Sequence, residues 1–97
     1  MNREDLIYRK CIEKWGVTPQ LDQTIEESAE LIQAINKFKR QRGDFEIVVE
    51  EVVDVQIMIN QVKVILSNIY GESCIENKYK EIWDKKIERI SKIVGVD

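Results

Sequence analysis

Apolar residues recur every three or four positions along most of the chain, which is the period of an amphipathic α-helix. Strand-like alternation and Asn-Gly hairpin signals do not appear. Glycine is common just past the last turn of a helix, and four glycines interrupt the pattern at nearly even intervals: Gly16, Gly43, Gly71 and Gly95. The sequence therefore predicts an all-α fold, a four-helix bundle-like subunit with helices at about residues 3–14, 19–41, 44–70 and 73–94.

Residues that commonly cap helices stand near each expected start. A side-chain oxygen there can accept a hydrogen bond from a free backbone N–H of the first turn, and proline suits the first helical position. A Ser with a Glu three residues later can form a capping box. The candidates are Asn2, Thr18 followed by Pro19, Asp44, and Ser73 with Glu76.

The apolar positions predict which helix faces are buried. The second helix should turn inward a stripe made of Leu21, Ile25, Ala29, Ile32 and Ile35. The stripe of the fourth is Ile75, Tyr79, Ile82, Trp83, Ile87, Ile90 and Val94.

Valine and isoleucine cover nearly the whole circumference of the third helix, between residues 47 and 66. A helix that is apolar all round is usually buried on every side, and a chain this short has few helices to cover it. We therefore expect a homo-oligomer, a homodimer or homotetramer, whose interface includes this helix. The alternative is a monomer that leaves some β-branched residues partly exposed.

Composition narrows the classes of protein. The chain has 97 residues, of which 43% are hydrophobic and 34% charged, as in a single helix-rich globular domain spanning residues 1–97. Its formal net charge of -3 argues against nucleic acid as a partner. Histidine is absent, which excludes catalytic triads that use imidazole and disfavours di-iron bundles built on Glu-x-x-His.

The N-terminus and the cysteines bear on location. Arg3, Glu4 and Asp5 interrupt any apolar N-terminal run, so a signal peptide is not expected, and we expect no membrane partner. Cys11 and Cys74 are far apart without CxxC spacing, and we interpret both as small buried apolar residues. The predicted location is cytoplasmic.

Two acidic motifs are the strongest indication of chemistry. They are Glu26-Glu27-Ser28-Ala29-Glu30 and Glu51-Val52-Val53-Asp54. Each places carboxylates one helical turn apart, so Glu27 and Glu30 share one face of a helix and Glu51 and Asp54 share one face of the next. Like charges at this spacing repel. A hard divalent cation would neutralise them, because it prefers carboxylate oxygens.

The simpler interpretation of either motif alone is a solvated helix surface, because glutamate forms helices well. Two motifs on adjacent helices that a short connection makes antiparallel favour convergence on one or two Mg²⁺ ions.

The ordered motifs resemble the MazG-like, all-α nucleoside triphosphate pyrophosphohydrolases. Besides EExxE and the later ExxD, the resemblance includes Trp15-Gly16, Gln20 and the basic run from Lys85 to Arg89, and it covers roughly residues 8–90. It implies hydrolysis of a nucleoside triphosphate to the monophosphate and pyrophosphate, with Mg²⁺ as cofactor and Mn²⁺ as a possible substitute.

The resemblance also implies roles for individual residues. Glu27, Glu30, Glu51 and Asp54 would be metal ligands. Glu26 would lie beside them, and it or Glu27 would take part in catalysis by activating the attacking water.

Three more residues are candidates for substrate binding. Many family members carry Asn near the position of Lys85 and Lys86. Lys86 and Arg89 are expected to contact phosphate; the alternative is that they only form a solvated, cationic helix end. Trp15 could stack on a nucleobase, although an aromatic residue here more often fills space between helices.

The alternative function is a non-catalytic helical dimer that binds a metal or a partner protein.

Overall fold

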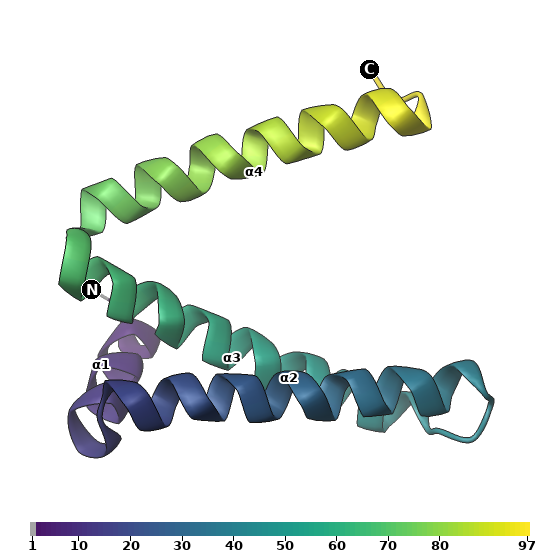
Figure 1. Cartoon of the computed structure of the whole chain (residues 1–97), viewed down its shortest axis with the longest axis horizontal. Helices are drawn as coiled ribbons and strands as arrows, with labels where there is room; N and C mark the ends of the chain where they lie inside the picture. The colour runs from purple at the N-terminus through teal and green to yellow at the C-terminus, as the bar shows by residue number, and fades with distance from the viewer. Residues whose placement is uncertain (1) are drawn as a thin grey trace. The chain divides into compact units, whose positions relative to one another are not determined.

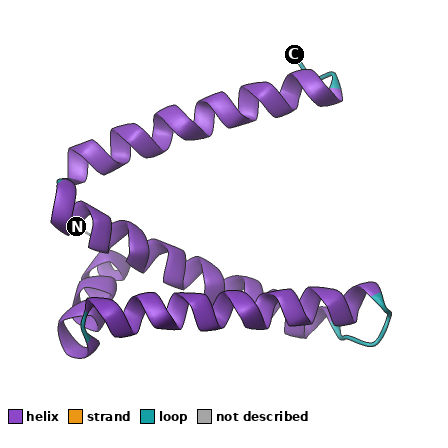
Figure 2. Cartoon of the chain, in the orientation of Figure 1, coloured by secondary structure: helices purple, strands orange, loops and turns teal. Residues whose placement is uncertain are grey.

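The computed structural model describes residues 2–97, and four α-helices contain most of them (Figure 2). They are α1 (Arg3–Trp15), α2 (Val17–Lys39), α3 (Phe45–Tyr70) and α4 (Glu72–Val94). No strand occurs in this range. The prediction of an all-α fold is confirmed, and each helix boundary lies within two residues of its expected position.

The chain divides into two compact units, residues up to 65 and residues 66–97. The first contains α1, α2 and most of α3, and α2 runs alongside α3 (Figure 1). A hydrogen bond from Gln20 Nε2 to Gln61 Oε1 joins the start of α2 to the later part of α3. Another runs from Asn60 Nδ2 to the Tyr8 hydroxyl at 3.2 Å and joins α3 to α1. The second unit contains the end of α3 and all of α4.

Three predicted helix ends are confirmed. The Asn2 side chain accepts a hydrogen bond from the Asp5 N–H at 2.8 Å, and the Asp44 side chain accepts one from the Glu46 N–H at 3.0 Å. Both bonds satisfy free backbone donors at a helix start. Gly95 ends α4 in the left-handed conformation, with φ of 79°.

The other expected ends are wrong in detail. Gly16 and Gly71, with φ of 93° and 99°, precede α2 and α4 directly, so Thr18 and Ser73 lie inside the first turns and make no N-cap. Gly43 does not end α2, which stops at Lys39. A Cβ at Gly43 would lie 3.1 Å from the backbone nitrogen of Phe38, so glycine there permits a close approach to the end of α2.

The expected inner stripe of α2 is also wrong for the described chain. Ile25 and Ile32 are 69% and 60% exposed, whereas Gln20 and Ala34 are buried and Glu27 is half-buried. With 100° of rotation per residue, the face turned toward α3 lies about 140°, or two-fifths of a turn, from the predicted stripe. The apolar stripe is regular in the sequence, but α2 presents its more polar face to α3.

Large apolar side chains are exposed on α3 and α4 as well. On α3 the buried residues are Met58, Gln61 and Ile65, so this chain alone does not cover the helix on every side. On α4 no residue is buried. Tyr79 and Trp83, expected in the core, stack on each other with ring centroids 6.0 Å apart but remain 44% and 55% exposed.

Two smaller expectations concern membranes and thiols. By length and composition α3 could cross a membrane, but core helices of soluble proteins meet the same criteria. The cytoplasmic location therefore stays a prediction. Both cysteines are free thiols; Cys11 is half-buried and Cys74 is exposed, so the expectation that both are buried is wrong for Cys74.

Candidate metal centre

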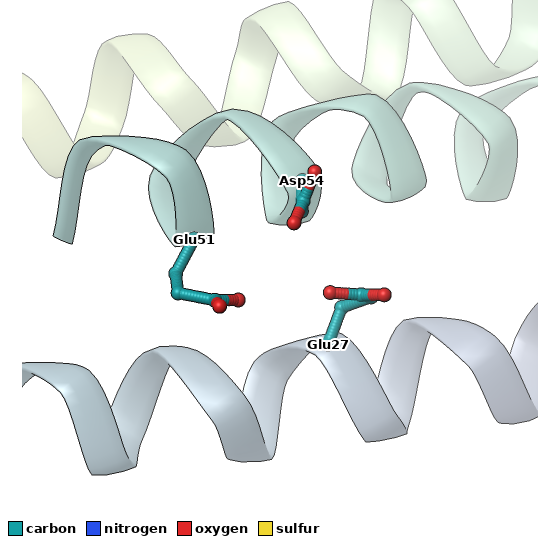
Figure 3. Close-up of side chains that lie close together, drawn as sticks. All are labelled: Glu27, Glu51 and Asp54. Carbon is teal, nitrogen blue, oxygen red and sulfur yellow. The ribbon is translucent and has the colours of Figure 1, made fainter. Parts of the chain in front are cut away.

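Facing positions of α2 and α3 bring three carboxylates together. Glu27 extends from α2 toward α3, and Glu51 and Asp54 extend from α3 toward α2 (Figure 3). One carboxylate oxygen from each residue lies within 4.8 Å of the other two. All three side chains are half-buried. The structure thus brings together three of the four residues predicted as metal ligands.

Hydrogen bonding orients this cluster without satisfying it. Gln23, one turn earlier on α2, donates from Nε2 to Glu27 Oε1 at 2.7 Å. With the carboxylates ionised, Glu27 Oε2 and Glu51 Oε2 are buried and have no hydrogen-bond donor. Buried acceptors without donors are rare and costly. Two lone-pair-bearing oxygens in the cluster are therefore available to a cation.

Burial and repulsion between negative charges raise the pKa values of two carboxyl groups, Glu51 and Glu30. Burial raises the pKa of Glu51 above its usual value, and the negative charges of Asp54, Glu27 and Glu50 raise it further. A hydrogen-bonding interaction with Glu30 is the smallest contribution and lowers the pKa of Glu51. The pKa of Glu30 is raised chiefly by the charge of Glu27, then by desolvation and by Glu51. A cation would relieve this repulsion and lower both pKa values.

The three oxygens suit a hard divalent cation in number, type and spacing. Two oxygens bound to one Mg²⁺ lie at most about 4.2 Å apart, and two bound to one Ca²⁺ at most about 4.6–5.2 Å apart. The upper limit of 4.8 Å in the cluster lies within the range for Ca²⁺, and any pair at that limit would have to move closer together to share one Mg²⁺. All the donors are carboxylate oxygens, which disfavours cations that prefer sulfur or imidazole. Three protein ligands would leave coordination positions for water or phosphate.

Glu30 and Glu26 lie at the edge of this arrangement. Both are exposed, and neither belongs to the group of three. Glu30 nevertheless interacts electrostatically with Glu27 and Glu51, so it is adjacent to the cluster. The charge of Glu26 also raises the pKa of Glu30, but less than the charges of Glu27 and Glu51 do. Glu30 therefore interacts with two members of the cluster, and Glu26 interacts with Glu30.

The predicted substrate-binding residues are exposed. Trp15 ends α1 and is 52% exposed, with the Lys14 ammonium 5.1 Å from its ring centroid. Lys86 and Arg89 lie on α4, in the other unit, and are exposed. Arg89 lines a surface hollow together with Asp84, Lys85, Glu88 and Lys92.

Sequence reasoning missed Gln23. Its signal was its position four residues before Glu27, because residues at i and i+4 are neighbours on a helix surface. A glutamine there can hold a carboxylate without neutralising it, which leaves the charge of Glu27 available for a cation.

Comparison of the chain with protein-family models, with curated proteins and with solved structures finds no match in any of the three. The family resemblance of the ordered motifs is therefore not supported by these comparisons, and function has to be argued from the residues themselves.

Proposed function

We propose that this chain is a divalent-cation-dependent pyrophosphohydrolase that converts a nucleoside triphosphate to the monophosphate and pyrophosphate. The observation that carries the proposal is the group formed by Glu27, Glu51 and Asp54, with oxygens within 4.8 Å of one another. The order of the acidic motifs and their resemblance to MazG-like enzymes supply the reaction class.

The residues of the cluster would hold the cation, and Mg²⁺ is the proposed cofactor, with Mn²⁺ as a substitute. A bound divalent cation neutralises charge on phosphate oxygens and lowers the pKa of a coordinated water. In the proposed reaction, the oxygen of water bonds to the α-phosphorus, the bond from that phosphorus to the bridging oxygen breaks, and pyrophosphate leaves. The proton of the water passes to a carboxylate and then to solvent. Gln23 would keep Glu27 in place during this exchange.

Basic residues are needed for the remaining phosphate charge. Lys86 and Arg89, three residues apart on α4, are the proposed phosphate contacts, and Trp15 the proposed stacking surface for the base. Their exposed side chains are available for such contacts.

Assembly into a homo-oligomer belongs to the proposal. It is supported by the exposed apolar residues of α2, α3 and α4, which include Ile25, Val49, Val53, Ile82 and Ile87. Exposed apolar patches of this kind mark interaction surfaces. Light scattering coupled to size exclusion would measure the mass, and a monomer across the micromolar range would contradict this part of the proposal.

The test of the activity is pyrophosphate release from a panel of canonical and modified nucleoside triphosphates, with Mg²⁺ and with EDTA. We expect cation-dependent turnover that falls more than about a hundredfold in Glu51→Gln and Asp54→Asn, because even residues that only support metal ligands cost 10–100-fold. The matched control is Glu50→Gln, an exposed neighbour on the same helix that undergoes the same change of charge. The proposal would be refuted if none of the substrates released pyrophosphate in a cation-dependent reaction.

A further inference from the structure

Two glutamines form the most deeply buried polar contact of the described chain. Gln20 on α2 is 8% exposed and Gln61 on α3 is 4% exposed. The side-chain amide of Gln20 donates to the side-chain oxygen of Gln61. Buried polar side chains need such partners, so the two residues constrain each other strongly.

This contact lies in register with the acidic cluster. Glu27 comes seven residues after Gln20, and Asp54 comes seven residues before Gln61. Seven residues are close to two helical turns, or about 10.5 Å along the axis. Because α2 and α3 run in opposite directions, a contact between the glutamines places Glu27 opposite Asp54. Three residues further along α2 and three residues back along α3, Glu30 lies opposite Glu51, in agreement with their electrostatic interaction.

Apolar packing alone does not specify this alignment. Besides the two glutamines, the buried residues of α2 and α3 are Ala34, Met58 and Ile65, so few apolar contacts oppose a slip of α3 along α2. A slip of one turn, about 5.4 Å, would move Glu51 and Asp54 away from Glu27. Buried polar pairs are known to fix helix register where apolar residues cannot.

We propose that Gln20 and Gln61 are positioning residues whose contact sets the register of α3 against α2 and thereby assembles the carboxylate cluster. The effect on register does not depend on the proposed function, whereas the consequence for metal binding rests on it. If the two glutamines contributed only to stability, replacing both would leave the register unchanged.

The decisive variant is the double substitution Gln20→Leu/Gln61→Leu. Replacing both partners of a buried hydrogen bond by apolar groups of similar shape is often neutral or stabilising. The double variant should therefore melt at the wild-type temperature or above it, yet lose the specified register. The matched control is Tyr8→Phe, which removes the hydrogen bond between Asn60 and Tyr8 and thus affects α1 and α3 but not the contact between α2 and α3.

Register is measured as the electron–electron distance between two spin labels, in chains in which Cys11 and Cys74 are replaced by Ser. Labels are attached at Asp22→Cys on α2 and Gln56→Cys on α3, both exposed positions. Labelled chains are diluted with unlabelled ones so that distances within one chain dominate. Mn²⁺ affinity is measured by calorimetry on the same proteins without labels.

We expect the double variant to show a shifted or broadened distance distribution and an Mn²⁺ affinity lower by about tenfold to a hundredfold, with Tyr8→Phe like the wild type. A distance distribution identical to the wild type would overturn the register role, whatever happens to the metal. If the wild type binds no Mn²⁺ but the double variant shifts register, the proposed function fails and the register role stands.

Discussion

Replacing Glu51 by Gln should change stability in opposite directions with and without a divalent cation. Glutamine has nearly the same shape as glutamate but no charge. In the wild type the pKa of Glu51 is raised by burial and by Asp54, so its charged form is disfavoured when no cation is present. Removing that charge should raise the melting temperature in EDTA. It should also remove one of the three carboxylates that would hold a cation.

The size of the cation effect follows from mass action. A ligand at 100 times its Kd stabilises the folded protein by about 2.7 kcal/mol. For a domain of this size each kcal/mol corresponds to about 4–8 °C, so the wild type should gain roughly 10–20 °C. If loss of Glu51 weakens binding about a hundredfold, the same concentration equals the new Kd and contributes only about 0.4 kcal/mol. The variant should then gain roughly 2–3 °C.

The assay is thermal unfolding followed by circular dichroism at pH 7.5, in EDTA and in Mn²⁺ or Mg²⁺ up to millimolar concentrations. Protein concentration is held constant because assembly would also shift the transition. Glu50→Gln makes the same change of charge at an exposed position next to the cluster. The charge of Glu50 raises the pKa of Glu51 less than those of Asp54 and Glu27 do, so this variant should keep most of the response to the cation.

Two results would refute this reasoning. If Glu51→Gln melts below the wild type in EDTA, the carboxylate is not in a repulsive environment. If neither cation stabilises the wild type, the three oxygens do not form a binding site. A reversal of the difference between the two proteins on adding the cation would support both the electrostatics and the site.

The raised pKa values, the α1 cap and the basic residues of α4 can each be tested by one measurement. Because the pKa values of Glu30 and Glu51 are raised, the folded state holds more protons, and in EDTA stability should fall as pH rises through the window above their usual pKa of about 4.5. Unfolding at pH 5, 6 and 7 measures this, and a stability that increases over that range would contradict it. Asn2→Ala removes the α1 cap and should cost about 1 kcal/mol in chemical unfolding, while an unchanged free energy would show that the cap is dispensable. Lys86→Ala/Arg89→Ala should raise KM for the nucleotide more than it lowers kcat, and unchanged kinetics would leave α4 outside the substrate site.

Part of the fold was predictable because its signals are local. Asn2 and Asp44 cap helices through hydrogen bonds to residues two or three positions away, and Gly95 supplies a left-handed residue after α4. The starts of α2 and α4 were misplaced because Gly16 and Gly71 adopt positive φ directly before the helix. Favourable cap residues at Thr18 and Ser73 then became part of the first turn.

The buried face of α2 could not be derived from periodicity. The stripe through Ile25 and Ile32 has helical spacing, but so does the line through Gln20, Glu27 and Ala34, which the structure turns toward α3. Which face packs depends on contacts with another helix, here the pair of Gln20 with Gln61. Spacing within each motif did predict that Glu51 and Asp54 share a face, because that relation is a property of one helix.

The choice of face on α2 connects the candidate metal centre to assembly. Turning Glu27 toward α3 places an unneutralised carboxylate between the two helices and leaves Ile25 and Ile32 in water. Each arrangement is unfavourable for the isolated chain, the first because like charges are brought together and the second because apolar area stays exposed. A cation would relieve the repulsion between the carboxylates, and a second copy of the chain would cover the exposed apolar area. Since the two would act on nearly opposite faces of one helix, cation binding and self-association would each stabilise the orientation of α2 in which Glu27 faces α3.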